Sequence, residues 1–320
     1  MKAILCRQYG APSLLRLEDS AQPTPAAQEL LVRVVASTVN RTDCAILSAR
    51  PFIMRFFTGL LRPKKAILGT EFSGEVLAIG AGVREFACGD RVFGFNDLGL
   101  CAHAQYLVIN ENQAIAKLPD HLSMQQAAAS IEGAHYAYNY MNKLSIRAGD
   151  KIAINGAGGA IGSALLQFCV ELGAEVTAIS EARHHELLCD LGAAHFIDYR
   201  KTDFSQAQRQ YDFVFDVVGT HSFQRCKSVL KARGIYMSSE LGRFAQNVFL
   251  PLLTRFSRGQ KVLFPMPGSI KASLPFILQR LENKNFVPVL DRSFPLEQIV
   301  AAYEYVASGV KTGNVVIEIG

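Results

Sequence analysis

The stretch IAINGAGGAIGSALLQFCVELGAEVTAIS, residues 152–180, decides the fold. A short apolar strand pattern runs into four glycines, a helical pattern follows, and a second strand pattern, EVTAIS, ends the stretch. A strand, a crossover helix and a second strand form a βαβ unit, whose strands run parallel. The glycine turn either holds a phosphate or only joins the strand to the helix.

The spacing of the glycines favours a phosphate site. Gly156, Gly159 and Gly162 match a dinucleotide-binding turn best, although Ile161 stands at the sixth position counted from Gly156. We expect the backbone N–H groups at the start of the helix, at Ala160 and Ile161, to face a pyrophosphate. The alternative is a glycine-rich turn that holds no ligand.

Strand and helix patterns alternate from about residue 123 onward, which is typical of a parallel sheet with crossover helices. Residues 1–122 instead contain short apolar runs separated by Gly, Pro and Asp, as in a β-sandwich or barrel. The sequence therefore predicts an α/β protein with a β-rich part and a parallel-sheet part. The expected helices are 123–143, 162–173, 183–192, 222–234, 274–284 and 296–309, and the expected strands after residue 123 are 151–155, 175–180, 194–199, 211–219, 234–239, 286–291 and 314–320.

Composition excludes several classes of protein. With 49% hydrophobic and 19% charged residues, the chain is globular and not disordered. The net charge of +5 comes from scattered basic residues, and no RNA motif or recognition helix is present, so we expect no nucleic-acid partner. No apolar run reaches the length of a transmembrane helix, and the N-terminus lacks the apolar core of a signal peptide.

The seven cysteines are odd in number and irregularly spaced, without a C-x-x-C pair. Reduced thiols in a cytoplasmic protein are the plain interpretation, because disulfides and structural zinc sites need paired or clustered cysteines. The sequence therefore predicts no metal site.

The end of the second strand points to the cofactor. NAD-binding folds usually place an acidic residue there for the ribose hydroxyls. Here the strand ends at Ser180, and Arg183 and His184 follow. These cations suit a 2′-phosphate, so we expect NADPH as the cofactor. In the alternative, Glu181 binds the ribose and the basic residues face solvent.

Motifs along nearly the whole chain resemble the medium-chain dehydrogenase/reductase superfamily, in its zinc-independent branch of quinone oxidoreductases (zeta-crystallin-like) and alkenal/enone reductases. They are VNRTD (39–43), GTEFSGEVLAIGAGV (69–83), GDRVFGF (89–95), NGAGGAIGSALLQ (155–167), LGAAHFIDY (191–199), YDFVFDVVG (211–219) and TGNVVIEIG (312–320). The resemblance implies a GroES-like catalytic domain (1–122 and 269–320), a Rossmann NADP-binding domain (123–268) and a homodimer.

Zinc enzymes of this superfamily carry a Cys near the position of Asn40 and a His where Thr70 stands, before Glu71. Both ligands are absent here, so the resemblance implies a zinc-independent enzyme. Without a Lewis acid, hydride transfer to an electron-poor acceptor is easier than oxidation of an alcohol. We therefore expect a small-molecule substrate, either a quinone or an enone.

Asn40 and Asp43 match the polar pair that the family places beside the nicotinamide, although a turn residue and a helix N-cap are the structural alternatives. Relatives often carry Tyr or Lys where this chain has Ala45. His135 is a candidate proton donor, because its usual pKa suits that work. In the alternative it is a packed helix residue bonded to a backbone carbonyl.

Further cofactor contacts are expected from position in the fold. Tyr199 is expected near the 2′-phosphate, or else as a packing residue at the strand end. Val218 and Gly219 are expected on the adenosine side, and Ser238 and Ser239 near the nicotinamide. Asn314 stands where a Lys commonly follows the glycine, which weakens a cofactor or interdomain contact.

Two apolar stretches keep several interpretations. Residues 50–65 mix Phe and Leu with Arg and Lys, so they form a wall of the substrate cleft, touch a membrane surface or pack on the sheet. We favour the cleft wall. Residues 247–256 form a lid, a dimer contact or simple core.

The leading hypothesis is an NADPH-dependent reductase of quinones or α,β-unsaturated carbonyl compounds. The alternative is an NADPH-binding sensor or structural protein with little catalysis. The absent side chain at Ala45 favours this second hypothesis, whereas the Asn40 and Asp43 pair argues against it.

Overall fold

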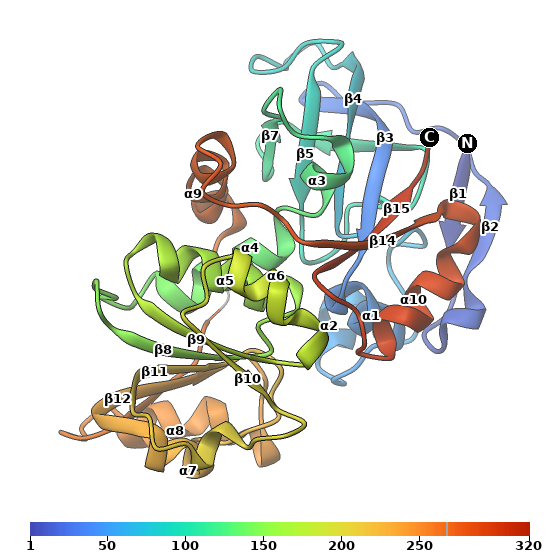
Figure 1. Cartoon of the computed structure of the whole chain (residues 1–320). Coiled ribbons are helices and arrows are strands. Elements are labelled where there is room, and N and C mark those ends of the chain that lie inside the picture. Colours follow the sequence, from blue (N-terminus) through green and yellow to red (C-terminus); the bar gives the residue numbers. More distant parts are fainter. Residues whose placement is uncertain (267) are drawn as a thin grey trace. The chain divides into compact units, whose positions relative to one another are not determined.

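Two units make up the computed structural model, which describes residues 1–266 and 268–320 (Figure 1). Unit 1 comprises Met1–Glu132, Ile270–Glu282 and Pro288–Gly320. Unit 2 comprises Gly133–Ser269 and Asn283–Val287. Each unit has its own sheet and its own hydrophobic core.

Unit 1 is built on a seven-stranded sheet in the order β14-β15-β3-β4-β5-β7, with β6 also paired to β3. All neighbours are antiparallel except β14 and β15, which are parallel. The strands are β3 (Glu29–Val39), β4 (Glu71–Ile79), β5 (Arg91–Phe95), β6 (Tyr106–Asn110), β7 (Ile115–Lys117), β14 (Leu290–Pro295) and β15 (Asn314–Glu318), and a separate hairpin pairs β1 (Lys2–Leu5) with β2 (Arg16–Asp19).

Strand β3 is the centre of unit 1 because it is long and almost entirely buried. Its sequence, ELLVRVVASTV, is rich in β-branched residues, which suit a pleated and packed surface. Leu30 and Val32 are completely buried, whereas Arg33 reaches the surface and pairs with Glu75 of β4.

Unit 1 also contains five α-helices in the described residues. They are α1 (Arg41–Ser48), α2 (Met54–Thr58), α3 (Met124–Ala128), α9 (Ile270–Glu282) and α10 (Ile299–Ala307). Of these, α3 and α10 pack on the sheet. Helix α3 packs on β3 and β4, which groups residues up to Glu132 with unit 1.

Unit 2 contains a six-stranded, wholly parallel sheet in the order β10-β9-β8-β11-β12-β13. The strands are β8 (Lys151–Asn155), β9 (Glu175–Ser180), β10 (His195–Asp198), β11 (Tyr211–Asp216), β12 (Leu230–Ser238) and β13 (Lys261–Leu263). The helices are α4 (Glu132–Met141), α5 (Ala160–Glu171), α6 (His185–Asp190), α7 (Phe223–Cys226) and α8 (Gln246–Thr254). Helices α5 and α6 lie on one face of the sheet, and α7 and α8 lie on the other (Figure 1).

This is the doubly wound Rossmann arrangement that the sequence predicts. The chain runs outward from β8 through β9 to β10, then returns to β11 on the other side of β8. The carboxyl ends of β8 and β11 therefore form the switch point of the sheet, where such folds bind ligands.

The predicted elements differ from the structure in three places. The helix expected over 123–143 is broken into α3 and α4 around Ser130, whose hydroxyl bonds the carbonyl of Ala127. The helix expected over 222–234 is wrong beyond residue 229, because β12 begins at Leu230 and pairs with β11 through a register shift. Most of the strand expected over 286–291 is also wrong, since β14 begins only at Leu290.

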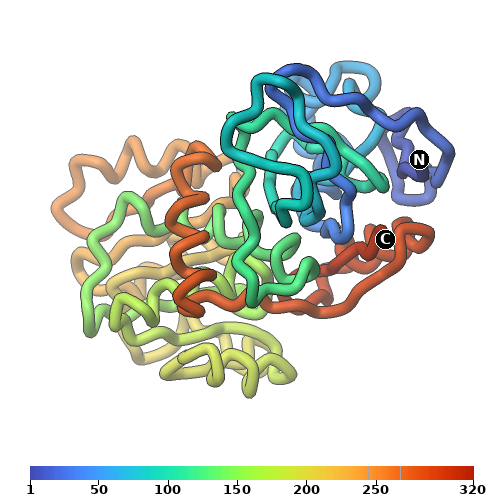
Figure 2. The backbone as a smooth tube through the Cα atoms, turned by 90° about the horizontal axis from the view of Figure 1, so that it is seen from above, coloured from blue at the N-terminus to red at the C-terminus, as the bar shows by residue number. Residues whose placement is uncertain are grey.

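The last segment of the chain returns to the first unit. Strand β15 inserts between β14 and β3, where Val316 lies opposite Thr38. Figure 2 shows the backbone as a tube, with the labelled C-terminus at the end of the red segment and the labelled N-terminus at the start of the blue segment. In the described part of the chain, no helix combines the length and hydropathy needed to cross a membrane.

We predict that Leu30→Ala destabilises unit 1 strongly. Removing this fully buried side chain leaves a cavity, which lowers the free energy of unfolding by about 2–5 kcal/mol. The control is Leu77→Ala in β4, where the side chain is 41% exposed and the expected loss is below about 1 kcal/mol. Denaturant unfolding followed by circular dichroism measures both, and equal losses would show that β3 is not the centre of the core.

Candidate functional site

Two positions of the glycine turn after β8 have a backbone geometry or a close contact that only glycine permits. Gly156 has φ of +90°, a left-handed conformation that disfavours other residues. At Gly162 an added Cβ atom would lie 2.2 Å from the carbonyl oxygen of Gly156, so a side chain there would push α5 away from the turn. The pattern of Gly156, Gly159 and Gly162 thus reflects a tight turn followed by close helix–strand packing.

Helix α5 begins directly after this turn and presents an uncapped N-terminus. Gly159 occupies the N-cap position, and no side chain accepts a hydrogen bond from the first turn, which contains Ala160 and Ile161. Free backbone N–H groups and the positive end of the helix dipole suit an anion. The turn therefore fits the pyrophosphate of a dinucleotide.

The carboxyl end of β11 is held beside this turn by Asp216, which is fully buried. Its Oδ1 atom accepts hydrogen bonds from Asn155 Nδ2 at 2.9 Å and from the Gly219 N–H at 2.9 Å. Val218 is also close, since a Cβ atom added to Gly156 would lie 2.5 Å from its Cγ1. The structure thus brings the predicted residues Val218 and Gly219 next to the glycine turn.

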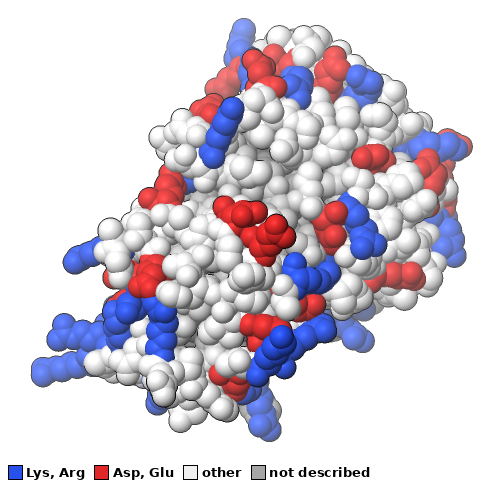
Figure 3. All heavy atoms as spheres, in the orientation of Figure 1, with Lys and Arg blue, Asp and Glu red and all other residues white. Residues whose placement is uncertain are grey.

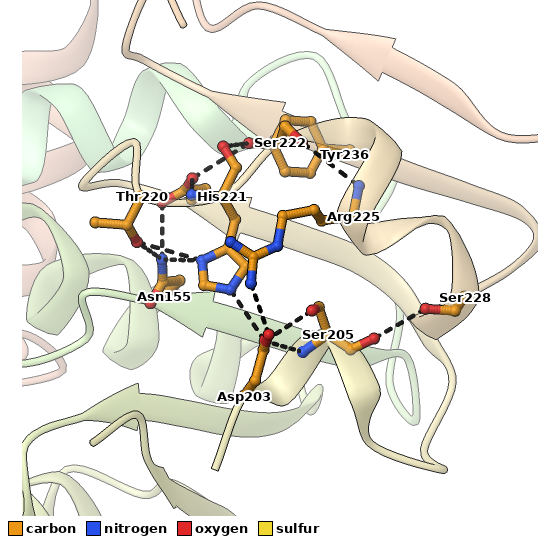
Figure 4. A network of polar contacts seen from close by, with 10 residues as sticks. Asn155, Asp203, Ser205, Thr220, His221, Ser222, Arg225, Ser228 and Tyr236 are labelled. Carbon is orange, nitrogen blue, oxygen red and sulfur yellow. Dashed lines mark hydrogen bonds and ion pairs between the residues drawn. The ribbon is translucent and has the colours of Figure 1, made fainter. Parts of the chain in front are cut away.

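A polar network extends from this loop, and Figure 4 shows His221 at its centre. The His221 Nε2 atom donates to Asp203 Oδ1 at 3.2 Å, and its Nδ1 atom faces Thr220 Oγ1 at 3.3 Å. Ser205 and Arg225 also donate to Asp203, and these contacts, with that of Ser205 the strongest, hold the pKa of the Asp203 carboxyl well below its usual range. The network fixes the loop after β11, and sequence reasoning did not identify it.

A second polar group follows β9. Ser180 Oγ is hydrogen-bonded to His184 Nδ1 at 2.7 Å, and both side chains are buried. They lie under the glycine turn, because a Cβ atom added to Gly158 would come within 2.5 Å of His184 Nδ1. His184 therefore supports the turn from inside and is not an exposed helix cation.

Glu181 is held by three neighbours. Tyr199 Oη donates to Oε1 at 2.9 Å, Arg200 donates to the same oxygen at 2.9 Å, and Arg183 Nε donates to Oε2 at 3.1 Å. Burial acts to raise the pKa of the Glu181 carboxyl, but the bond from Tyr199 and the two arginines together lower it.

Arg200 is a residue of this group that sequence reasoning missed. It becomes visible only through sheet pairing, because β10 lies beside β9 with Asp198 opposite Ser180. The carboxylate of Glu181 and the guanidinium groups of Arg183 and Arg200 together carry a net positive charge, which suits an anionic ligand.

In unit 1, Asn40 and Asp43 form the N-terminal cap of α1. Asn40 Oδ1 accepts from the Asp43 N–H at 2.9 Å, and Asp43 Oδ2 accepts from the Asn40 N–H at 3.1 Å. The two residues therefore form a capping box, in which Asn40, expected as a turn residue in the structural alternative, is the N-cap and Asp43, expected as the N-cap, is the third helical residue. Asn40 Nδ2 also donates to Thr70 Oγ1 at 2.8 Å, so the two positions that carry zinc ligands in zinc relatives are bonded to each other.

Asp43 has a second feature that a cap does not need. Its Oδ1 atom is buried and accepts no hydrogen bond within the described residues. Burial raises the pKa of the Asp43 carboxyl to about 8, and the nearby charge of Glu132 adds to this. At neutral pH this carboxyl is largely protonated.

Two further buried carboxyls lie close to Asp43. Glu71 accepts from the Thr38 hydroxyl at 2.5 Å and from the Glu132 N–H at 2.9 Å, and Glu132 accepts from Thr42 Oγ1 at 3.1 Å. Burial is the main cause that raises the pKa of each carboxyl, to about 8 for Glu71 and about 7 for Glu132.

Lys311 lies near one of these acids, Glu132, and its ammonium group donates to the carbonyl of Gly313. Burial lowers the pKa of its ammonium group, while the charge of Glu132 opposes that change. Glu132 and Lys311 lie 179 positions apart in the sequence (311 − 132), and no motif links them.

His135, the candidate proton donor, is completely buried in α4. Its Nε2 atom lies 3.1 Å from Asn139 Nδ2, one turn along the helix. Burial lowers the pKa of the imidazole to about 4, which keeps it neutral at neutral pH. These properties favour the alternative of a packed helix residue, bonded here to a side-chain amide.

The remaining predicted residues lie in both units. Ser238 is buried at the end of β12, and the Ser239 N–H donates to Tyr140 Oη at 2.7 Å. Asn314 belongs to unit 1, where its N–H and its Nδ2 both donate to the carbonyl of Val289. This bonding gives Asn314 a structural role at the start of β15.

Residues 1–266 and 268–320 contain no group of three His, Cys, Asp or Glu side chains arranged to hold a metal ion. On the face in Figure 3 both signs of charge are present, with Asp and Glu side chains near the centre and several Lys and Arg side chains at the lower left. That face offers no broad positive field of the kind that binds nucleic acid.

Comparisons with known proteins match both parts of the chain. The alcohol dehydrogenase GroES-like domain matches residues 26–143, and the zinc-binding dehydrogenase family matches residues 191–317. A zinc-type alcohol dehydrogenase-like protein of Schizosaccharomyces pombe is 30% identical over 242 residues, which are 71% of this chain and 68% of that protein. An NADPH-dependent alkenal/one oxidoreductase of Arabidopsis thaliana is 26% identical over 99% of this chain and 79% of its own.

The fold has a close counterpart among solved structures. A quinone oxidoreductase from Coxiella burnetii superposes with a TM-score of 0.86 at 25% identity, and the match covers 100% of this chain and 99% of that one. Its likeness extends over both sheets and the glycine turn between β8 and α5. The chain therefore belongs to the medium-chain dehydrogenase/reductase superfamily of nicotinamide-dependent oxidoreductases.

Proposed function

We propose that this protein is a zinc-independent, NADPH-dependent reductase that delivers a hydride to a quinone or an α,β-unsaturated carbonyl compound. The observation that carries the proposal is the hydrogen bond between Asn40 and Thr70, because these side chains replace two zinc ligands and satisfy each other. An amide and a hydroxyl are weak ligands for zinc. Relatives with quinone and alkenal/one reductase names support the same reaction class.

NADPH supplies the hydride when it is bound. The chain's own residues must bind the cofactor, orient the acceptor and provide a proton. An electron-poor acceptor needs little Lewis-acid help, but the enolate or hydroquinone formed must be protonated.

Asp43 is the proton donor in this proposal. Its carboxyl is fully buried and largely protonated at neutral pH, and its Oδ1 atom forms no hydrogen bond within the described residues. Ala45 carries no group that donates a proton, and His135 is neutral with an Nε2 that faces Asn139. Asn40 positions Asp43 through the capping box.

The proposed site for the 2′-phosphate consists of Glu181, Arg183, Tyr199 and Arg200. The carboxylate aligns the two guanidinium groups, and the tyrosine hydroxyl completes the group. Glu181 is occupied by these contacts, which argues against a role for it in binding the hydroxyl groups of an unphosphorylated ribose.

A homodimer and a cytoplasmic location stay predictions.

The reaction is tested by mixing the protein and NADPH with a phenanthrenequinone or a medium-chain enal, with NADH in parallel, and following loss of the reduced cofactor. Turnover with a preference for NADPH is expected. Tight NADPH binding without turnover of either substrate class would contradict the proposal and favour the nucleotide-binding alternative.

We predict that Arg183→Ala combined with Arg200→Ala raises KM for NADPH by about a hundredfold or more, because charged hydrogen bonds contribute about 1.5–3 kcal/mol each and about 1.4 kcal/mol corresponds to a factor of ten. KM for NADH should change by less than about twofold, since that cofactor lacks the 2′-phosphate. Steady-state kinetics with both cofactors measure the effect, and Arg84→Ala, an exposed residue of unit 1, is the control. An equal rise for both cofactors would exclude a 2′-phosphate site here.

We predict that Asp43→Asn lowers turnover but stabilises the protein at high pH. The native Asp43 carboxyl holds its proton up to about pH 8, whereas the unfolded one loses it near pH 4. Between these values the native state binds more protons, so its stability falls as pH rises, by up to about 1.4 kcal/mol per pH unit.

Thermal melting between pH 5 and pH 8 measures this effect. The melting temperature of Asp43→Asn relative to the parent should rise with pH, while exposed Asp120→Asn should give a constant difference. If the melting temperatures of the parent and of Asp43→Asn change with pH in the same way, the Asp43 carboxyl does not hold its proton in the native state.

A further inference from the structure

Residues 50–65, here called the α2 segment, expose large apolar side chains next to one another. Phe56 is 64% exposed and Leu61 is 85% exposed. The full set is Phe52, Ile53, Phe56, Phe57, Leu60 and Leu61. Single exposed apolar residues are ordinary, but a run of six in one short segment marks an interaction surface.

The α2 segment is held firmly in this exposed position. Tyr9 Oη lies 2.8 Å from Thr58 Oγ1 and donates to the carbonyl of Gly59 at 2.7 Å. The Arg55 guanidinium lies 4.8 Å from the Tyr9 ring centroid and donates to the carbonyl of Leu60 at 3.0 Å. The apolar side chains are therefore displayed by anchored backbone.

The same segment is strongly basic. Residues 50–65 contain five Lys and Arg residues and no Asp or Glu, and the nearest acidic residues in the sequence are Asp43 and Glu71. Its charge of +5 equals the net charge of the whole chain. The basic residues are Arg50, Arg55, Arg62, Lys64 and Lys65.

A cavity of about 490 Å³ opens at the start of this segment. It is lined by the two arginines Arg50 and Arg55, the rings of Tyr9 and Phe52, and the residues Gly10, Ser48 and Ala49. Within the described residues, the Arg50 guanidinium forms no ion pair. Two guanidinium groups at one opening match the geometry and charge of a phosphate.

We propose that the α2 segment docks on the surface of an anionic phospholipid bilayer, with its apolar side chains in the headgroup–acyl boundary and a lipid phosphate in the cavity of Arg50 and Arg55. Apolar side chains surrounded by Lys and Arg characterise interfacial membrane contacts. A protein partner fits less well, because the cores of protein interfaces are depleted of lysine. The inference stands apart from the proposed reaction, and it replaces the cleft wall favoured from the sequence, because all six apolar side chains are exposed beside basic residues.

The test uses the full chain and vesicles of phosphatidylcholine with or without phosphatidylglycerol, in a co-sedimentation assay. Binding is expected only with the anionic lipid, and added salt should weaken it because salt screens the basic side chains. Equal binding to both vesicle types, or no binding to either, overturns the proposal.

Two variants locate the surface. Phe56→Ser with Leu61→Ser should lower the partition coefficient for anionic vesicles about tenfold, and Arg50→Gln should lower it less. The matched control is Phe249→Ser with Leu253→Ser, which removes comparably exposed apolar side chains from α8 in unit 2. Thermal melting confirms that all variants fold.

Two results would overturn the assignment. In the first, the control pair loses as much binding as the α2 pair. In the second, the parent associates with itself in a concentration-dependent way that the α2 pair abolishes, without binding vesicles, which would identify a second copy of the chain as the occupant.

Discussion

Unit 2 depends on the close approach of α5 to the end of β8. Gly162 permits it, since any Cβ atom there would collide with the Gly156 carbonyl. The approach aims the uncapped start of α5 across the glycine turn and brings that turn against Val218. Asp216 holds the loop after β11, because its carboxylate accepts hydrogen bonds from the N–H groups of Gly219 and His221. The position of the helix start against the turn therefore depends on one close backbone contact.

Unit 1 shows the opposite arrangement, in which polar groups are buried at a cost to stability. Asp43, Glu71 and Glu132 are each nearly or fully excluded from solvent, and each lowers that cost by keeping a proton or accepting hydrogen bonds. Glu71 has partners for both oxygens, whereas Asp43 has one oxygen without a partner. A helix cap alone does not require an acid at this position, which agrees with the role proposed for Asp43.

Sequence patterns predicted the parts that local chemistry determines. The glycine register and the parallel sheet follow from spacing and alternation, and the structure has both. The helix expected over 222–234 failed because LKARG has good helix formers, but Leu230 pairs with Tyr211 across the sheet. Arg200 and Lys311 were missed because their partners, Glu181 and Glu132, are distant in sequence and meet only after the sheets form. Their roles in the proposed sites stay predictions.

The position of β15 has a consequence for synthesis of the protein. This strand lies between β3 and β14 in the sheet of unit 1, yet it follows both of them in the sequence and is synthesised after them. Until then, β3 lacks its neighbour along Ala36–Val39, and the core around it stays open to solvent. All of unit 2 precedes β14 and β15 in the chain, so its strands are synthesised before the sheet of unit 1 can be completed. Between the synthesis of β3 and that of β15, the apolar strands of unit 1 are therefore accessible to chaperones.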